Sequence, residues 1–244
     1  HVKPKKPAMR LLLITTFTTL FISCNFMDDR IRGNGDITTR EEEMGPFNSI
    51  DIRGAVKVYI TQAQDYSVNI ETDRNLMEFL DVSVIGNTLV VGTRKGYNLR
   101  PSKGIVAHIS APKFNKINVS GASEIIGENA LTGDNVHIGA SGASKIILEL
   151  SGNRLVTDLS GASTLILKGD VKDFDLEAGG ASDINCFDLV TENARVDLSG
   201  ASTVNLTVNK SLHAEASGAS NVNYKGSASV NSKSSGAGTI KKVD

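Results

Sequence analysis

The chain has 244 residues, a formal net charge of −1 and 40% hydrophobic residues, enough for one good-sized core or two small ones. Aromatic content is low at 5%, without Trp, and the 23 Gly recur in a pattern rather than in a low-complexity run. Such a chain is a poor candidate for binding nucleic acid through phosphates, and two cysteines are too few for a disulfide framework.

The first 23 residues have the pattern of a signal peptide. A basic start is followed by an apolar run of 12 residues, Leu11 to Ile22, which is too short to span a membrane. Met9 is the expected translation start, so residues 1–8 do not enter the fold argument. Removing residues 1–23 takes away four bases and no acids, which leaves 22 bases against 27 acids and a net charge of −5.

A lipid acceptor is expected at Cys24. Phe21-Ile22-Ser23-Cys24 resembles a bacterial lipobox, in which the cysteine is acylated and becomes the mature N-terminus, although Leu is the usual first residue. The alternative is an ordinary signal peptide with an incidental cysteine. Two or more acyl chains hold a protein stably to a bilayer, so these residues predict a lipoprotein of the outer membrane.

Residues 24–45 are expected to form a polar, lipid-anchored tether. Acidic residues soon after the cysteine, such as Asp28 and Asp29, resemble the surface-export signals of Bacteroidetes lipoproteins. A solvated linker explains the same charges. The sequence therefore predicts location in the cell envelope, and exposure at the cell surface is a further expectation that rests on these acidic residues.

Residues 46–110 alternate between apolar and polar positions, as half-buried strands do. Strands are expected at 50–52, 56–60 and 68–70 and on both sides of the hairpin signal Gly86-Asn87, with one helical turn over 74–80. These strands should begin the sheet and cap the first coil of the repeats that follow, which would otherwise expose an edge.

A Ser-Gly-Ala-Ser tetrad recurs through residues 111–242 and is the strongest signal in the chain. Its copies, two of them variants, start 18–21 residues apart. They begin at Ser120, Ser141, Ser160, Gly179, Ser199, Ser217 and Ser235. Apolar and polar residues alternate on both sides of each copy, which predicts a strand before it and a strand after it.

Each repeat is interpreted as a strand, a Gly-Ala corner, a second strand and a turn, because glycine tolerates backbone angles that other residues avoid. Turns are expected at Ser151-Gly152-Asn153, Lys168-Gly169-Asp170 and Asn209-Lys210-Ser211. Such short repeats cannot bury their apolar side alone, so they should stack into a continuous core. The predicted fold is an all-β, parallel β-helix-like solenoid, taken as right-handed, of about six coils and roughly 30 Å.

Several segments occur in an order that is fairly specific as a set. They are Gly54-Ala55-Val56-Lys57-Val58-Tyr59-Ile60, Tyr66-Ser67-Val68-Asn69-Ile70-Glu71, Asn75-Leu76-Met77, Gly86-Asn87-Thr88-Leu89-Val90-Val91 and the tetrads. In this order they resemble the auto-transporter adhesin head GIN domains of Bacteroidetes, and a single domain of that type is expected over residues 46–242. The resemblance implies a β-solenoid-like fold and an extracytoplasmic location, and it brings no established catalytic residues.

Acidic residues stand two positions before the tetrad in four consecutive repeats. They are Asp158, Glu177, Asp197 and Glu215, and two positions further back lie His137, Asp175, Arg195 and His213. If the register is right, the acids stack on one outer face, where like charges need screening or a partner. The functional interpretation is a ligand or cation stripe that includes His137 and His213. The alternative is a solvated strand face on which Arg195 relieves part of the repulsion.

Catalysis has little support in the sequence. Carboxylates about 5 Å apart would suit a retaining glycosidase, but no constellation of nucleophile, histidine and acid stands out. The four histidines are too scattered to predict zinc, so neither a metal nor a cofactor is expected. Cys186 shares the inward position of Leu148 and Leu167 and is expected to be a small core residue.

Ile126, Ile147 and Ile166 lie three residues after their tetrads, on the face opposite the core. Later repeats have Asn185, Asn205 and Asn223 there, which should form a ladder of side-chain hydrogen bonds. The isoleucines should be covered, either by the N-terminal strands, which we expect, or by a second subunit.

These observations predict a non-enzymatic, adhesin-like lipoprotein whose solenoid presents a binding face. The expected partners are the membrane through the lipid anchor, a glycan or another host or envelope component, and a further copy of the chain. Two alternatives stay open: a carbohydrate-active β-helix enzyme that uses the stacked acids, and a structural envelope protein whose role is to oligomerise.

Overall fold

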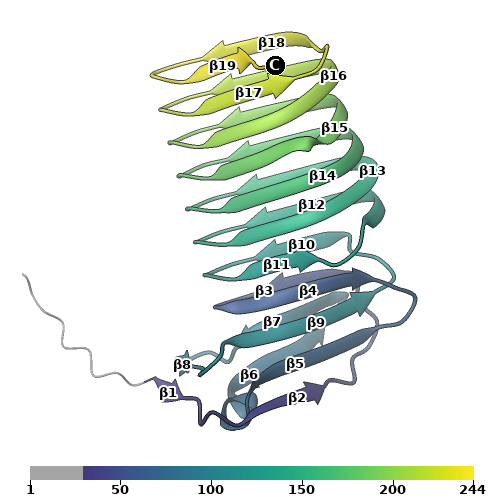
Figure 1. Ribbon diagram of the computed structural model, residues 1–244, viewed down its shortest axis with the longest axis vertical. Coiled ribbons are helices and arrows are strands. Elements are labelled where there is room, and N and C mark those ends of the chain that lie inside the picture. Colours follow the sequence, from purple (N-terminus) through teal and green to yellow (C-terminus); the bar gives the residue numbers. More distant parts are fainter. Residues whose placement is uncertain (1–29) are drawn as a thin grey trace, which may run out of the picture.

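The computed structural model describes residues 30–244, so the predicted leader and Cys24 lie outside the described residues. The described chain is almost entirely β-strand and is wound into a tall, flattened β-solenoid (Figure 1). Neighbouring coils pair in parallel along two opposite faces. The predicted all-β solenoid is confirmed, while its right-handedness stays a prediction.

The elements fall into a base and a stack. The base comprises β1 (Ile31–Arg32), β2 (Ile37–Glu41), β3 (Ser49–Ile52), β4 (Val56–Gln62), β5 (Ser67–Asp73), the 3-10 helix η1 (Arg74–Phe79), β6 (Leu80–Ile85), β7 (Thr88–Thr93), β8 (Leu99–Arg100) and β9 (Ile105–Ala111). The stack comprises β10 (Lys116–Val119), β11 (Glu124–Gly127), β12 (Leu131–Ala140), β13 (Lys145–Leu159), β14 (Thr164–Ala178), β15 (Asp183–Leu198), β16 (Thr203–Ala216), β17 (Asn221–Lys225), β18 (Ser229–Ser234) and β19 (Thr239–Lys242).

The chain does not climb steadily from the base to the stack. β3 and β4 form a coil that pairs with β7 and β9 on one side and with β10 and β11 on the other, all in parallel. Beyond them, β6 pairs antiparallel with β7 across the Gly86-Asn87 hairpin, and β5 pairs antiparallel with β9. The expected hairpin, helical turn and N-terminal cap are all present.

Residues 30–41, expected to be part of a tether, instead pack on the base. β1 pairs in parallel with β8, and β2 pairs antiparallel with β5. These strands are short and only partly buried, so they need few apolar residues and resemble a polar linker in sequence.

The tetrad glycine forms one corner of each coil, as predicted. Its φ lies between +69° and +84°, a region that residues with side chains rarely adopt. A Cβ on Gly161 would lie 2.5 Å from the carbonyl oxygen of Gly142 in the preceding coil. Ala162 donates its backbone N–H to the same carbonyl at 2.7 Å. Close stacking of the corners therefore requires a residue without a side chain.

The last serine of the tetrad is buried behind the corner. Ser144 and Ser163 are at most 2% exposed, and each donates its hydroxyl to the carbonyl of its tetrad's first residue, at 2.7 and 2.9 Å. This bond supplies the partner that a buried hydroxyl requires. The hydroxyl of Ser220 has no such partner among the described residues.

The second corner of the coil differs from the expected turn. Ser151-Gly152-Asn153, Lys168-Gly169-Asp170 and Asn209-Lys210-Ser211 all lie inside continuous strands of 14 or 15 residues. Each strand bends there, but the next coil bends beside it, so the parallel pairing continues around the corner. Register shifts between β14 and β15 and between β15 and β16 fall at this corner, which absorbs the variation in repeat length.

The core is the narrow space between the two faces, filled by residues that alternate inward on both sides of each tetrad. In one coil these include Leu165, Leu167, Phe174 and Leu176, each at most 3% exposed. Cys186 is fully buried at the position predicted for it. The alternation fixes which residues face solvent, and so determines the surface columns described next.

Candidate binding groove

Four carboxylates form a column on the outer face of the strand segments that precede the tetrads, hereafter the acidic face. Asp158 is in register with Glu177, Glu177 with Asp197, and Asp197 with Glu215. Adjacent parallel strands lie about 4.8 Å apart, so these side chains stack with no coil between them. The register predicted from the tetrads is correct.

Histidines accompany the two ends of this column. His137 Nε2 lies 3.2 Å from Asp158 Oδ2, and His213 Nε2 lies 3.4 Å from Glu215 Oε1. In the middle, Glu177 and Asp197 make no ion pair with any described residue.

Arg195 lines the same face together with Glu177 and Asp197, although no described carboxylate is within ion-pair distance of it. The relief of repulsion by Arg195, which the alternative interpretation includes, stays a prediction. Arg154 makes an ion pair of 2.6 Å with Asp175 on the same face. The middle of the column is therefore the part whose carboxylates make no ion pair with a described residue.

A shallow groove runs along the acidic column, beside the tetrad corners. One part is lined by Asp158, Glu177 and Asp197 together with Ser160, Gly179 and Ser199. A second part continues from Asp158 and Ser160 to Ser141, Ser120 and Asp51. The groove is thus bordered by carboxylates on one side and by the first residues of the tetrads on the other.

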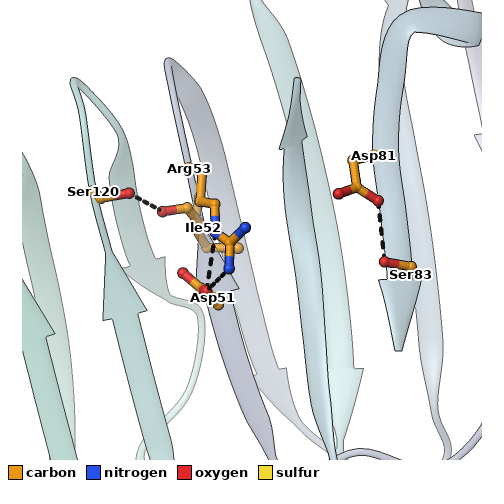
Figure 2. A network of polar contacts seen from close by, with 6 residues as sticks. All are labelled: Asp51, Ile52, Arg53, Asp81, Ser83 and Ser120. Carbon is orange, nitrogen blue, oxygen red and sulfur yellow. Dashed lines mark hydrogen bonds and ion pairs between the residues drawn. The ribbon is translucent and has the colours of Figure 1, made fainter. Parts of the chain in front are cut away.

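The groove reaches the base at a small polar network (Figure 2). Arg53 makes an ion pair with Asp51, which raises the pKa of the guanidinium, and Ser120 donates its hydroxyl to the carbonyl of Ile52 at 3.3 Å. In the same view, Ser83 donates to Asp81 at 3.1 Å. Asp51 is in register with Asn118, which stands opposite Gly139 in the next coil.

Sequence reasoning identified the acids but not the other wall of the groove. The first tetrad serines were assigned only to the corner, although Ser160 and Ser199 are exposed and line the groove. Asp51 was missed because its coil lacks a complete tetrad. The Gly54-Ala55 pair, with φ of +94° at Gly54, was the available signal that a corner lies there too.

A cation site finds no support in the geometry. No three His, Cys, Asp or Glu side chains in residues 30–244 are grouped so that they could hold a metal ion. The chemistry offered by the groove is hydrogen bonding: carboxylate oxygens accept, and serine hydroxyls both donate and accept.

The opposite outer face, hereafter the isoleucine face, shows a second column. Ile126, Ile147 and Ile166 are in register and partly buried, and the column continues downward to Tyr59, whose ring stacks on His108 at 5.0 Å. The expected cover by N-terminal strands is wrong, since β4 and β9 extend the stack edge to edge rather than lying over it. An interface with a second subunit stays a prediction.

The asparagines continue this column upward. Asn185, Asn205 and Asn223 are in register, and Asn223 donates its side-chain amide to Asn205 at 2.8 Å. The predicted ladder is therefore present between these last two residues.

The described residues contain no helix that is both long and apolar enough to cross a bilayer. The lipidation predicted at Cys24 falls outside the described residues and stays a proposal.

The repeat-built β-solenoid places the protein among stacked-coil scaffolds, and comparison with known proteins gives its family. Residues 46–228 match the family described as "Putative auto-transporter adhesin, head GIN domain", and the chain belongs to this family. This confirms the resemblance seen in the sequence. No curated protein matches the chain.

Several solved structures share the fold. A putative adhesin from Bacteroides fragilis is 25% identical, with a TM-score of 0.79 over 87% of this chain and 100% of that one. A putative lipid binding protein from Parabacteroides distasonis is 21% identical, with a TM-score of 0.73 over 88% and 100%. A putative adhesin from Parabacteroides merdae is 21% identical, with a TM-score of 0.68 over the same shares.

Proposed function

We propose that the protein is a lipid-anchored, non-enzymatic adhesin of the cell envelope that binds a hydroxyl-rich ligand, a glycan or a glycan-bearing envelope component, in the groove of the acidic face. The family and two of the three structural neighbours described above are named adhesins, which supports an adhesin-like role, a place in the envelope and a function other than catalysis. The anchor rests on the lipobox-like residues that end at Cys24.

The observation that carries the proposal is a gap in the serine wall. Gly179 replaces the first tetrad serine, so the wall has no side chain between Ser160 and Ser199. The gap lies beside Glu177 and Asp197, the two carboxylates without an ion pair. A space and two available acceptors therefore coincide in the middle of the groove.

The chemistry of the groove suits neutral or amino sugars. Sugar hydroxyl and ammonium groups donate hydrogen bonds to carboxylates, and serine hydroxyls can complete the contacts. A column of four acids would repel sialylated or uronic glycans, because like charges across an interface are unfavourable. The acidic column also repeats at coil spacing, which allows an extended oligosaccharide to contact several coils.

The test is binding of the purified protein to a glycan array that carries neutral, amino and acidic oligosaccharides. We expect binding to neutral or amino sugars. Gly179→Ser should weaken it at least tenfold, because a Cβ there already lies 3.3 Å from the hydroxyl of Ser199 and the added hydroxyl fills the gap. Glu177→Gln should also weaken it, through loss of a charged acceptor.

Glu149→Gln provides the matched control, because Glu149 belongs to a strand segment that follows a tetrad and its carboxylate pairs with Lys168 at 2.7 Å. It should bind as the wild type does. A blank array, or binding that Gly179→Ser and Glu177→Gln leave unchanged, would contradict the proposal. Cleavage of a bound oligosaccharide would favour the glycosidase alternative instead.

A further inference from the structure

The described chain begins in a segment that is fixed to the base. β1 pairs with β8, with a hydrogen bond of 2.8 Å from Ile31 N to Asn98 O and one of 3.0 Å from Gly33 N to Arg100 O. Asn75 adds a bond from its side-chain amide to the carbonyl of Arg32 at 2.8 Å. The path of the chain is therefore set as far as Ile31.

A buried carboxylate holds this segment in place. Asp73 is fully buried and accepts hydrogen bonds from Gly35 N at 2.7 Å and from the backbone and hydroxyl of Ser102 at 2.8 and 2.7 Å. Burial acts to raise the pKa of Asp73, but these bonds outweigh it and lower the pKa, so the carboxylate stays charged. Gly33 is needed beside it, since a Cβ there would lie 2.2 Å from the carboxyl group.

Little chain separates this clamp from the predicted lipid anchor. Only residues 25–29 lie between Cys24 and Arg30. A fully extended chain covers at most about 3.6 Å per residue, so a lipidated Cys24 can be no further than about 20 Å from the start of the described chain. The stack of seven corners extends about 30 Å beyond the base, at about 4.8 Å per coil.

The base carries exposed hydrophobic side chains. The two most exposed large hydrophobic residues described are here, Ile85 at 67% and Tyr97 at 48%, and the Tyr97 ring packs on Phe79 with centroids 4.8 Å apart. Aromatic side chains of this kind are favoured at the boundary between lipid and water.

The segment that contains Tyr97 is rich in positive charge. The β7–β9 connection, residues 94–104, contains four cations and no carboxylate: Arg94, Lys95, Arg100 and Lys103. Arg30 and Arg32 add two more, which Asp28 and Asp29 offset in number. The base as a whole is balanced, since residues 30–111 contain ten cations and ten carboxylates. The excess of positive charge is therefore local to this connection, whose β8 lies beside β1, where the described chain begins. Basic residues beside a membrane are attracted to anionic lipid.

From the clamp, the short reach and the composition of the β7–β9 connection, we infer that the base of the solenoid lies on an anionic lipid surface, with this connection against the lipid and the solenoid axis along the bilayer normal. In Figure 1 the membrane would lie beneath the base and β19 would point away from it. This orientation rests on the proposed lipid anchor. It would raise the groove of the acidic face above the bilayer, with the Gly179 gap at the fourth of the seven corners.

The orientation can be measured with the full-length protein, purified with its anchor and reconstituted into vesicles of phosphatidylcholine with about one third phosphatidylglycerol. A fluorophore is attached at Asn98→Cys in the base or at Ser234→Cys in the last coil. Cys186 is buried with a thiol pKa of about 12, so it does not compete for the label. Quenching by headgroup-labelled nitroxide lipid should be several-fold greater at position 98.

Two further experiments test whether the lysines of the base and the anionic lipid are responsible for the quenching. Lys95→Glu with Lys103→Glu should reduce quenching at Asn98→Cys, whereas Lys172→Glu with Lys233→Glu, the same charge change on outer coils, should not. Vesicles of phosphatidylcholine alone should reduce quenching at Asn98→Cys as the Lys95→Glu and Lys103→Glu substitutions do. Equal quenching at positions 98 and 234, or a base label indifferent to lipid charge and to the lysines, would overturn the inference.

The intact mass of the same sample distinguishes this failure from failure of the anchor. A protein without acyl chains on Cys24 refutes the lipid anchor of the proposed function and removes the basis of the orientation. An acylated protein whose base label is not quenched refutes the orientation alone.

Discussion

Substitution of a tetrad glycine tests whether the corner, rather than the strands alone, determines the stability of the solenoid. Gly161→Ala introduces a side chain where φ is +78°, which costs about 1–2 kcal/mol for a residue with a Cβ. The same Cβ would be 2.5 Å from the carbonyl oxygen of Gly142, and overpacking of this kind costs about 1–3 kcal/mol. The expected loss is therefore about 2–5 kcal/mol.

A second glycine separates the two contributions. Gly86 has a φ of +62° in the β6–β7 hairpin, but an added Cβ would have no neighbour within 4 Å. Gly86→Ala should therefore lose only the conformational part, about 1–2 kcal/mol.

Urea unfolding followed by circular dichroism measures both variants, and amide hydrogen exchange at Ala162 reports on the corner itself. That amide should exchange faster in Gly161→Ala, because its 2.7 Å bond to the carbonyl of Gly142 is displaced. If Gly161→Ala is no less stable than Gly86→Ala, the close approach of successive corners does not limit stability and the reasoning fails.

Three other predictions follow from buried or stacked groups. Ser163→Ala should cost about 1 kcal/mol in urea unfolding by removing a 2.9 Å bond, and Ser220→Ala should cost less because its hydroxyl has no partner. Burial raises the pKa of Cys186 to about 12, so the thiol should resist alkylation at pH 8 until the protein unfolds. The stabilising contribution of the neutral Cys186 thiol should be complete below its ordinary pKa of 9.0 and should be lost as the pH rises towards 12. Glu177→Gln should raise the melting temperature at low salt and not at high salt, by relieving repulsion within the acidic column, whereas Glu149→Gln should give no increase.

Regular features of the sequence predicted the stack well. The tetrads gave the corner, the inward alternation and the register of the acidic column, because neighbouring coils of a solenoid repeat the same backbone path. Asp197 could be placed between Glu177 and Glu215 simply by counting from the glycines. The same counting placed Cys186 in the core.

Features that depend on contacts between distant segments could not be predicted in this way. β1 and β2 are fixed by β8 and β5, and their sequences alone resemble a linker. The second corner has no required residue, since bending beside an already bent coil needs only continued backbone pairing. Cover of the isoleucine face was misjudged because edge-to-edge stacking and face-to-face packing of the N-terminal strands give the same alternating pattern.

The division between fixed and free positions also bears on the proposed ligand groove. Second tetrad positions must be glycine, and the fourth, up to Ser220, is a buried serine, so neither can change without disturbing the corner. First positions face the groove and tolerate exchange, as Gly179 in place of serine shows within this chain. A change there alters the shape of the wall while the backbone pairing of the coil, including the bond from Gly179 N to Leu159 O at 2.9 Å, is retained. If the groove binds a ligand as proposed, its recognition can therefore change one coil at a time without loss of the fold.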